Sequence, residues 1–115
     1  MVRDILRRGD ITWVNFEPQI GKEIKKKRPA LVISPNSYNQ TGLAAFMPIT
    51  SKVKGYIFEV PIETKKLTKG VVLCDQIRTL DWRRRQIRKY DEIDEETIEK
   101  VLFCLKSFLF DEFLF

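Results

Sequence analysis

The sequence predicts a mainly β domain: a small barrel of short antiparallel strands with one amphipathic helix at its C-terminal end. Short runs rich in β-branched and aromatic residues recur every 10–15 residues through the first ninety, which is typical of small antiparallel barrels. Clusters of Gly, Pro and Asn separate these runs, and no helical spacing intervenes. The apolar spacing changes to the helical 3, 4, 7 pattern only after residue 93.

The predicted strands follow one another along the chain. They are ITWVNF (11–16), PALVISP (29–35), LAAFMPIT (43–50), YIFEVPI (56–62) and GVVLCDQIRTL (70–80). In the fourth run, every second residue from Tyr56 to Ile62 is apolar, so these side chains share one face of the sheet. The fifth run is long enough to bend or to cross the sheet. Two polar connections, at 17–27 and 35–42, are of a length that often carries function.

One amphipathic helix is predicted over residues 94–109. Asp94 is a suitable N-cap, and Glu95 and Glu96 in the first turn favour the helix dipole. We expect its buried face to consist of Ile98, Val101, Leu102, Leu105, Phe108 and Leu109. The aromatic tail at 110–115 is expected to dock on the body or on a partner, because so much exposed aromatic area is unusual.

Length and composition predict one domain, residues 1–115, with strands over about 10–90. No apolar run approaches the roughly 20 residues of a membrane helix, and the charged start has no signal-like apolar stretch.

The spacing of Cys74 and Cys104 matches no metal-binding or redox motif, so we expect reduced, buried thiols in a cytoplasmic protein. A disulfide between them is the alternative. The chain has no histidine, the commonest general base and metal ligand, and we expect no metal or cofactor.

Positive charge is concentrated in the body of the chain. Residues 1–90 hold 19 Lys and Arg against 8 Asp and Glu, whereas residues 91–115 hold 2 against 8. A body this basic predicts a polyanion or an acidic protein as partner. A solvated cationic surface that only aids solubility is the alternative.

The run KKKRPALVISP, residues 25–35, places Arg28 at the mouth of a predicted buried strand. A guanidinium stays charged and can hold a phosphate through two hydrogen bonds. Pro29 stiffens the entry to the strand and would help to aim the side chain. The sequence therefore predicts an anion site at Arg28; a salt bridge to Asp75 or Glu23 is the alternative.

Several motifs lie in a fixed order between Gly9 and Trp82: GDITWVNFEP, G-K-E, RPALVISP, P-I-T-S, KGYIFEV and DQIRTLDW. Together they resemble the MazF/PemK family of toxin endoribonucleases, over most of the chain. The resemblance implies a CcdB/MazF-like fold, an SH3-like barrel with a C-terminal helix, and a homodimer. It also implies sequence-specific, metal-independent cleavage of single-stranded RNA, which inhibits translation and growth. A MazE-like antitoxin would neutralise the enzyme by covering the RNA groove with its acidic tail.

Cleavage without a metal uses the 2′-hydroxyl of the RNA as nucleophile and leaves 2′,3′-cyclic phosphate and 5′-hydroxyl ends. By resemblance, Arg28 matches the catalytic arginine of the family and Thr50 the catalytic threonine; a strand-end cap is the alternative for Thr50. Glu23 and Asp75 match acidic positions of the family, and either could assist as the base. Some relatives carry a second arginine where this chain has Leu73, so a mechanism that uses it does not carry over.

Further residues are expected to contact RNA through phosphates or base edges. They are Lys25, Lys26, Lys27, Ser51, Lys52, Lys54, Gln76 and Arg78, and a solvated charge is the alternative for each lysine. The arginines at 83–85 either contact RNA or, as we favour, pair with Asp81, Asp91 and Glu92. We expect Trp13 and Phe16 to be core or dimer contacts rather than stacking platforms.

Two other functional classes compete with the ribonuclease interpretation. A non-catalytic RNA-binding barrel would bind RNA without cutting it. A gyrase-poisoning, CcdB-like toxin would share the fold, but such relatives end in Trp-Gly-Ile, whereas this chain ends in Phe-Leu-Phe. The combination of Arg28, Thr50 and Gln76 favours the ribonuclease.

Overall fold

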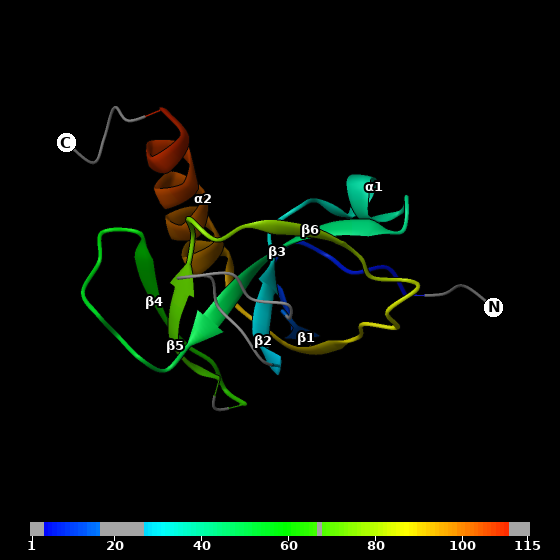
Figure 1. Cartoon of the computed structure of the whole chain (residues 1–115), viewed down its shortest axis with the longest axis horizontal. Coiled ribbons are helices and arrows are strands. Elements are labelled where there is room, and N and C mark those ends of the chain that lie inside the picture. The colour runs from blue at the N-terminus through cyan, green and yellow to red at the C-terminus, as the bar shows by residue number, and fades with distance from the viewer. Residues whose placement is uncertain (1–3, 17–26, 67, 111–115) are drawn as a thin grey trace.

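An antiparallel sheet curls into half a barrel, and a helix lies beside it (Figure 1). The computed structural model describes residues 4–16, 27–66 and 68–110. Its strands are β1 Asp10–Asn15, β2 Lys27–Val32, β3 Leu43–Thr50, β4 Glu59–Glu63, β5 Lys69–Leu73, β6 Arg78–Asp81 and β7 Lys89–Glu92, and its helices are α1 Asn36–Asn39 and α2 Glu95–Phe110. The strand order is β4-β5-β3-β2-β1-β7, with β6 also paired to β3. This arrangement confirms the predicted mainly β fold with a C-terminal helix.

Strand β3 is the centre of the curl because it serves three neighbours. One edge pairs with β2; the other edge pairs with β6 near Leu43 and with β5 near Thr50. The predicted run 70–80 is therefore two strands, separated by a turn in which the Gln76 N–H donates to the Leu73 carbonyl at 3.2 Å. The run bends, as its length suggested, and both halves stay on the same edge of β3.

The strand predicted at 56–62 begins later than expected, at Glu59. The Glu59 carboxylate accepts hydrogen bonds from the backbone N–H groups of Lys54 and Gly55, the latter at 2.9 Å. These bonds fold the preceding residues into a loop, so Tyr56 lies outside the sheet and is exposed. The predicted buried face holds for Val60 and Ile62.

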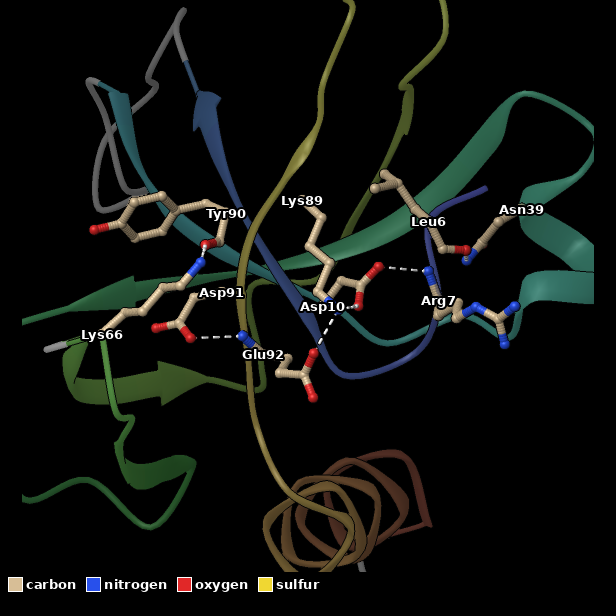
Figure 2. A network of polar contacts seen from close by, with 9 residues as sticks. All are labelled: Leu6, Arg7, Asp10, Asn39, Lys66, Lys89, Tyr90, Asp91 and Glu92. Carbon is tan, nitrogen blue, oxygen red and sulfur yellow. Dashed lines mark hydrogen bonds and ion pairs between the residues drawn. The ribbon is translucent and has the colours of Figure 1, made fainter. Parts of the chain in front are cut away.

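Two short elements are absent from the sequence prediction. One is α1, a single helical turn inside the connection that we expected to be a loop. The other is β7, whose sequence KYDE has no apolar alternation. Its buried residue is Asp91, whose carboxylate accepts hydrogen bonds from the hydroxyls of Thr64 and Thr68. It also accepts one from the Glu92 N–H, which Figure 2 shows. Polar contacts rather than apolar burial therefore hold β7 in the sheet.

Helix α2 begins at the predicted cap, since the Asp94 carboxylate accepts a hydrogen bond from the Thr97 N–H at 2.9 Å. Its buried face is partly different from the prediction. The buried positions are Ile98, Val101, Cys104 and Ser107, whereas Leu102 and Leu105 flank this line and Phe108 and Leu109 are exposed. The second half of the buried line consists of two small residues, Cys104 and Ser107, and the larger side chains of this half lie at its sides.

The sheet has a separate apolar core on each side. On one side, residues of β1 to β5 pack against α2 and include Leu31, Met47 and Val72. Inside the curl, a second cluster forms around Val14, Phe16 and others without any contribution from α2. Phe16 is thus a core residue, as one of our two alternatives stated. Among the described residues, no helix is long and apolar enough to cross a membrane.

Candidate active site

Arg28 and Thr50 meet where two neighbouring strands end. Ala30 lies opposite Pro48 in the β2–β3 ladder, and the same register continued by two residues brings Arg28 opposite Thr50. Residues opposite each other in such a ladder have side chains on one face. The Arg28 guanidinium Nη1 donates a hydrogen bond to the Thr50 hydroxyl at 3.4 Å. The structure thus brings the two predicted catalytic residues together.

The Thr50 hydroxyl is nearly buried and is already fixed by two donors. Besides Arg28, the backbone N–H of Lys52 donates to its oxygen at 3.2 Å. A hydroxyl has two lone pairs and one hydrogen. With both lone pairs engaged, the O–H of Thr50 is left to donate to an anion, so Thr50 and the half-buried Arg28 both present donors at one point.

Gly70 on the neighbouring strand β5 is a position that the sequence analysis missed. Its φ is +151°, and a Cβ atom at this position would lie 2.3 Å from the carbonyl oxygen of Thr50. Only glycine allows β5 to approach Thr50 this closely. A glycine inside an otherwise apolar strand is the sequence signal that could have found it.

The residues after Thr50 form an exposed cationic loop. Ser51, Lys52 and Lys54 are all exposed, and Tyr56 beyond them is 62% exposed. The loop is anchored at its far end by the hydrogen bonds to the Glu59 carboxylate. These predicted RNA contacts therefore lie on a fixed loop that starts at the catalytic candidate.

The other predicted residues of the DQIR motif lie in the β5–β6 turn. Asp75 is exposed and Gln76 is half-buried. Arg78 has a structural contact in addition, because its Nη1 donates to the Phe16 carbonyl at 3.0 Å and its guanidinium lies over the Phe16 ring. Arg78 thus joins the end of β1 to β6.

Three predicted residues, Glu23, Lys25 and Lys26, lie outside the described residues. Lys27, the next in the basic run, is the exposed first residue of β2. Trp13 on β1 is 43% exposed, so the prediction that it is a core residue of this chain is wrong.

The two thiols are buried and unlinked. Burial raises the pKa of Cys74 well above its ordinary range, and burial likewise raises the pKa of Cys104. Raised values keep the thiols protonated at neutral pH, and a protonated thiol is a poor nucleophile. The prediction that both cysteines are buried is confirmed, and neither thiol is suited to catalysis.

The fold and the site define a class: a small half-barrel domain that presents an arginine and a hydroxyl to an anion beside a basic loop. Residues 7–109 match the family model described as the PemK-like, MazF-like toxin of type II toxin–antitoxin systems. The endoribonuclease toxin MazF of Escherichia coli (strain K12) is 38% identical over 94 residues, which cover 81% of this chain and 84% of that protein. The chain therefore belongs to the PemK-like, MazF-like toxin family.

Solved structures agree with this assignment. The crystal structure of MazF from Deinococcus radiodurans is 42% identical and aligns with a TM-score of 0.84, covering 93% of this chain and 98% of that chain. A MazE–MazF crystal structure from the same organism is 42% identical with a TM-score of 0.79, covering 93% and 97% of the two chains.

Proposed function

We propose that this chain is an endoribonuclease toxin that cleaves single-stranded RNA at specific sequences and thereby inhibits translation and growth. The observation that carries the proposal is the contact between Arg28 and Thr50 at the open ends of two strands. Membership of the toxin family and the endoribonuclease names of its relatives support it.

The chemistry follows from the two donors. The 2′-hydroxyl of the RNA loses its proton and attacks the adjacent phosphorus, and negative charge accumulates on the phosphate oxygens. The bond to the 5′-oxygen then breaks, and this oxygen takes up a proton from solvent. The guanidinium of Arg28 and the hydroxyl of Thr50 stabilise this charge in the transition state. The products are a 2′,3′-cyclic phosphate and a 5′-hydroxyl, and the attack itself requires no metal.

The proton acceptor for the 2′-hydroxyl is a carboxylate, either Glu23 or Asp75. Arginine stays protonated at neutral pH and is a poor acceptor. Asp75 lies in the turn after β5, the strand that contacts Thr50 through Gly70. The RNA itself is bound by the predicted contacts Lys25, Lys26, Lys27, Ser51, Lys52, Lys54, Gln76 and Arg78.

Two protein partners complete the proposal. A MazE-like antitoxin with an acidic tail binds the basic surface, as the MazE–MazF structures of relatives suggest. A second copy of the chain forms a homodimer, because the last turns of α2 expose Phe103, Leu109 and Phe110 to more than half of their surface. The reduced, buried thiols support a cytoplasmic location.

The test is to incubate the purified protein with a long single-stranded RNA in EDTA and to map the cut ends. Wild type should cut at discrete sites and leave 5′-hydroxyl ends. Arg28→Ala should lower the cleavage rate by at least about 100-fold, the usual effect of removing one transition-state donor. Arg28→Lys keeps the charge but not the two-pronged donor, so it should retain only part of the activity. Lys100→Ala, an exposed cation on α2, is the matched control and should cut normally.

Each other outcome identifies a different class of protein. RNA binding without cleavage by wild type would identify the non-catalytic barrel. Neither binding nor cleavage would direct attention to a protein target such as gyrase. Full activity of Arg28→Ala would overturn the assignment of the site.

A further inference from the structure

A second basic surface lies on the far side of β1 from Thr50. Strand β1 pairs with β7 only as far as Thr12, so its last residues, Trp13 to Asn15, have β2 as partner on one edge. Beside the other edge runs the segment 85–88. Between them lies an open groove of about 610 Å³.

The lining of this groove combines cations with an exposed aromatic ring. Lys27, Arg85 and Arg88 line it, together with Trp13, and no carboxylate is among its lining residues in the described part of the chain. The Arg85 guanidinium donates to the Asn15 carbonyl at 3.4 Å, which holds it against the strand edge. The three cations form no ion pair with any described carboxylate. Contrary to our preferred interpretation, the partners of Asp91 and Glu92 are Thr64, Thr68 and Lys89.

The exposed aromatic ring has a neighbour. Trp13 and Tyr90 meet edge to face, with ring centroids 5.9 Å apart, and each is about two-fifths exposed. Tyr90 lies on β7 next to the buried Asp91 (Figure 2). The Lys66 ammonium donates to the Tyr90 carbonyl at 3.1 Å and helps to fix this position. Aromatic side chains interleaved with cations are the composition of surfaces that bind single-stranded nucleic acid.

The groove adjoins the candidate active site. Trp13 lies opposite Pro29 and Val14 lies opposite Arg28 in the β1–β2 ladder. Neighbouring strands are about 4.8 Å apart, so the groove begins one strand beyond the catalytic arginine. Side chains alternate along a strand, so the Arg28 guanidinium lies on the face of Val14 and the Trp13 ring on the opposite face. An RNA strand held at Arg28 would therefore reach Trp13 by crossing the edge of β1 that faces the segment 85–88.

We propose that this groove binds the RNA that flanks the cleavage site, with bases stacked on Trp13 and Tyr90 and phosphates held by Lys27, Arg85 and Arg88. This proposal rests on the proposed ribonuclease function and extends the footprint of the same site. An acidic extended peptide is the competing occupant, since the edge of β1 that faces the groove could also accept a peptide strand.

Binding of a labelled, mixed-sequence 20-nucleotide single-stranded RNA tests the proposal, measured by polarisation over a salt series. Arg85→Ala/Arg88→Ala should weaken binding at least tenfold at low salt. It should also reduce the slope of log K against log salt by about 1.4, the value for two phosphate contacts to a single strand. Lys100→Ala/Lys106→Ala removes two exposed cations from α2 and is the matched control; it should bind as wild type does.

Stacking is tested separately from charge. Trp13→Leu should weaken binding at least about fivefold without changing the salt slope, because a stacked base carries no counterion. RNA should also quench the fluorescence of Trp13, whereas Trp82 is buried and its indole N–H is held by the Asn39 carbonyl at 2.9 Å. Trp13→Phe should therefore abolish the quenching.

The outcomes separate this proposal from the proposed function. If both groove variants bound RNA as tightly as wild type and still cut it, the groove proposal would be wrong and the ribonuclease proposal would stand. If wild type did not cut RNA but the groove variants bound it more weakly than wild type, the groove proposal would be supported and the ribonuclease proposal would be wrong. If the variants bound RNA normally but no longer bound an acidic peptide, the peptide would be the occupant and our proposal would be wrong. For a cutting enzyme, the groove variants should raise KM and leave kcat nearly unchanged.

Discussion

At the scale of single residues, the candidate site depends on one close backbone approach. Gly70 and Thr50 lie on paired strands, and no side chain fits between the Gly70 Cα and the Thr50 carbonyl oxygen. Thr50 in turn fixes its hydroxyl beside Arg28. The position of the catalytic hydroxyl is therefore set partly by a residue that carries no functional group.

Gly70→Ala should accordingly damage both stability and activity. Its new methyl group would meet backbone atoms, which cannot move aside as a side chain can. Gly42→Ala is the control, since φ there is also positive, at +96°, but the nearest atom is an Arg83 side-chain carbon at 3.5 Å. Gly42→Ala should carry only the conformational cost of about 1–2 kcal/mol. Gly70→Ala should lose at least about 1 kcal/mol more in urea unfolding and should also cut RNA more slowly. Equal losses would show that the close approach to Thr50 is not maintained.

At the scale of elements, α2 is positioned by small side chains. Ser107 is fully buried and its hydroxyl donates to the Phe103 carbonyl at 2.9 Å, so it satisfies its own polar group within the helix. Cys104 lies one turn earlier on the same line. These two small residues are buried, whereas the larger leucines beside them are only partly buried, so the line of Cys104 and Ser107 has the least room for a larger side chain.

Ser107→Leu should therefore destabilise the protein although it adds apolar area. The larger side chain overfills the contact line, and overpacking usually costs about 1–3 kcal/mol. Glu99→Leu places the same residue on an exposed position of the same helix and should change the free energy of unfolding by less than about 0.5 kcal/mol. Both are measured by urea unfolding at one protein concentration. A neutral Ser107→Leu would mean that the helix can move away from the sheet at little cost.

At the scale of the whole molecule, some parts of the structure follow from the sequence and others do not. Apolar periodicity predicts β1, β3 and the extent of α2, and motif order predicts that Arg28 and Thr50 lie together. Periodicity fails for β7, because its inward residue is Asp91. It also fails for part of the face of α2, because Ser107 is polar and Cys104, although expected to be buried, is not counted in the apolar spacing. It also gives no warning of Asn39, which is completely buried.

Asn39 illustrates why such positions escape pattern analysis. Its side-chain amide donates to the carbonyls of Leu6 at 2.7 Å and Ser34 at 3.0 Å. Leu6 lies 33 residues before Asn39 and Ser34 lies 5 residues before it. Neither separation belongs to a helical or strand repeat. A buried polar residue is determined by the groups that surround it in three dimensions, and a single sequence does not display them.

The acid stability of the whole molecule reflects two buried carboxylates with opposite behaviour (Figure 2). Burial works to raise the pKa of Asp91, but hydrogen bonds from Thr64, Thr68 and the Glu92 N–H outweigh it and hold the pKa below the ordinary 3.8. Burial raises the pKa of Asp10 above 3.8, although the Arg7 N–H and the Lys89 ammonium oppose the shift. Asp91 therefore stabilises the fold above its unfolded pKa and loses this contribution as the pH falls through its folded pKa. Asp10 behaves oppositely, since its folded form takes up a proton before its unfolded form does.

Replacing each carboxylate by its amide should thus change the pH dependence in opposite directions. Asp91→Asn should be less stable than wild type at pH 6, and its free energy of unfolding should fall less as the pH drops below about 4, where the carboxyl takes up its proton more readily in the unfolded chain than in the folded one. Asp10→Asn should fall more steeply than wild type as the pH approaches about 4 from above, because the compensating proton uptake by the folded chain is gone. Urea unfolding at intervals of half a pH unit measures both slopes. If the two variants changed the slope in the same direction, the opposite pKa shifts of Asp91 and Asp10 would be wrong.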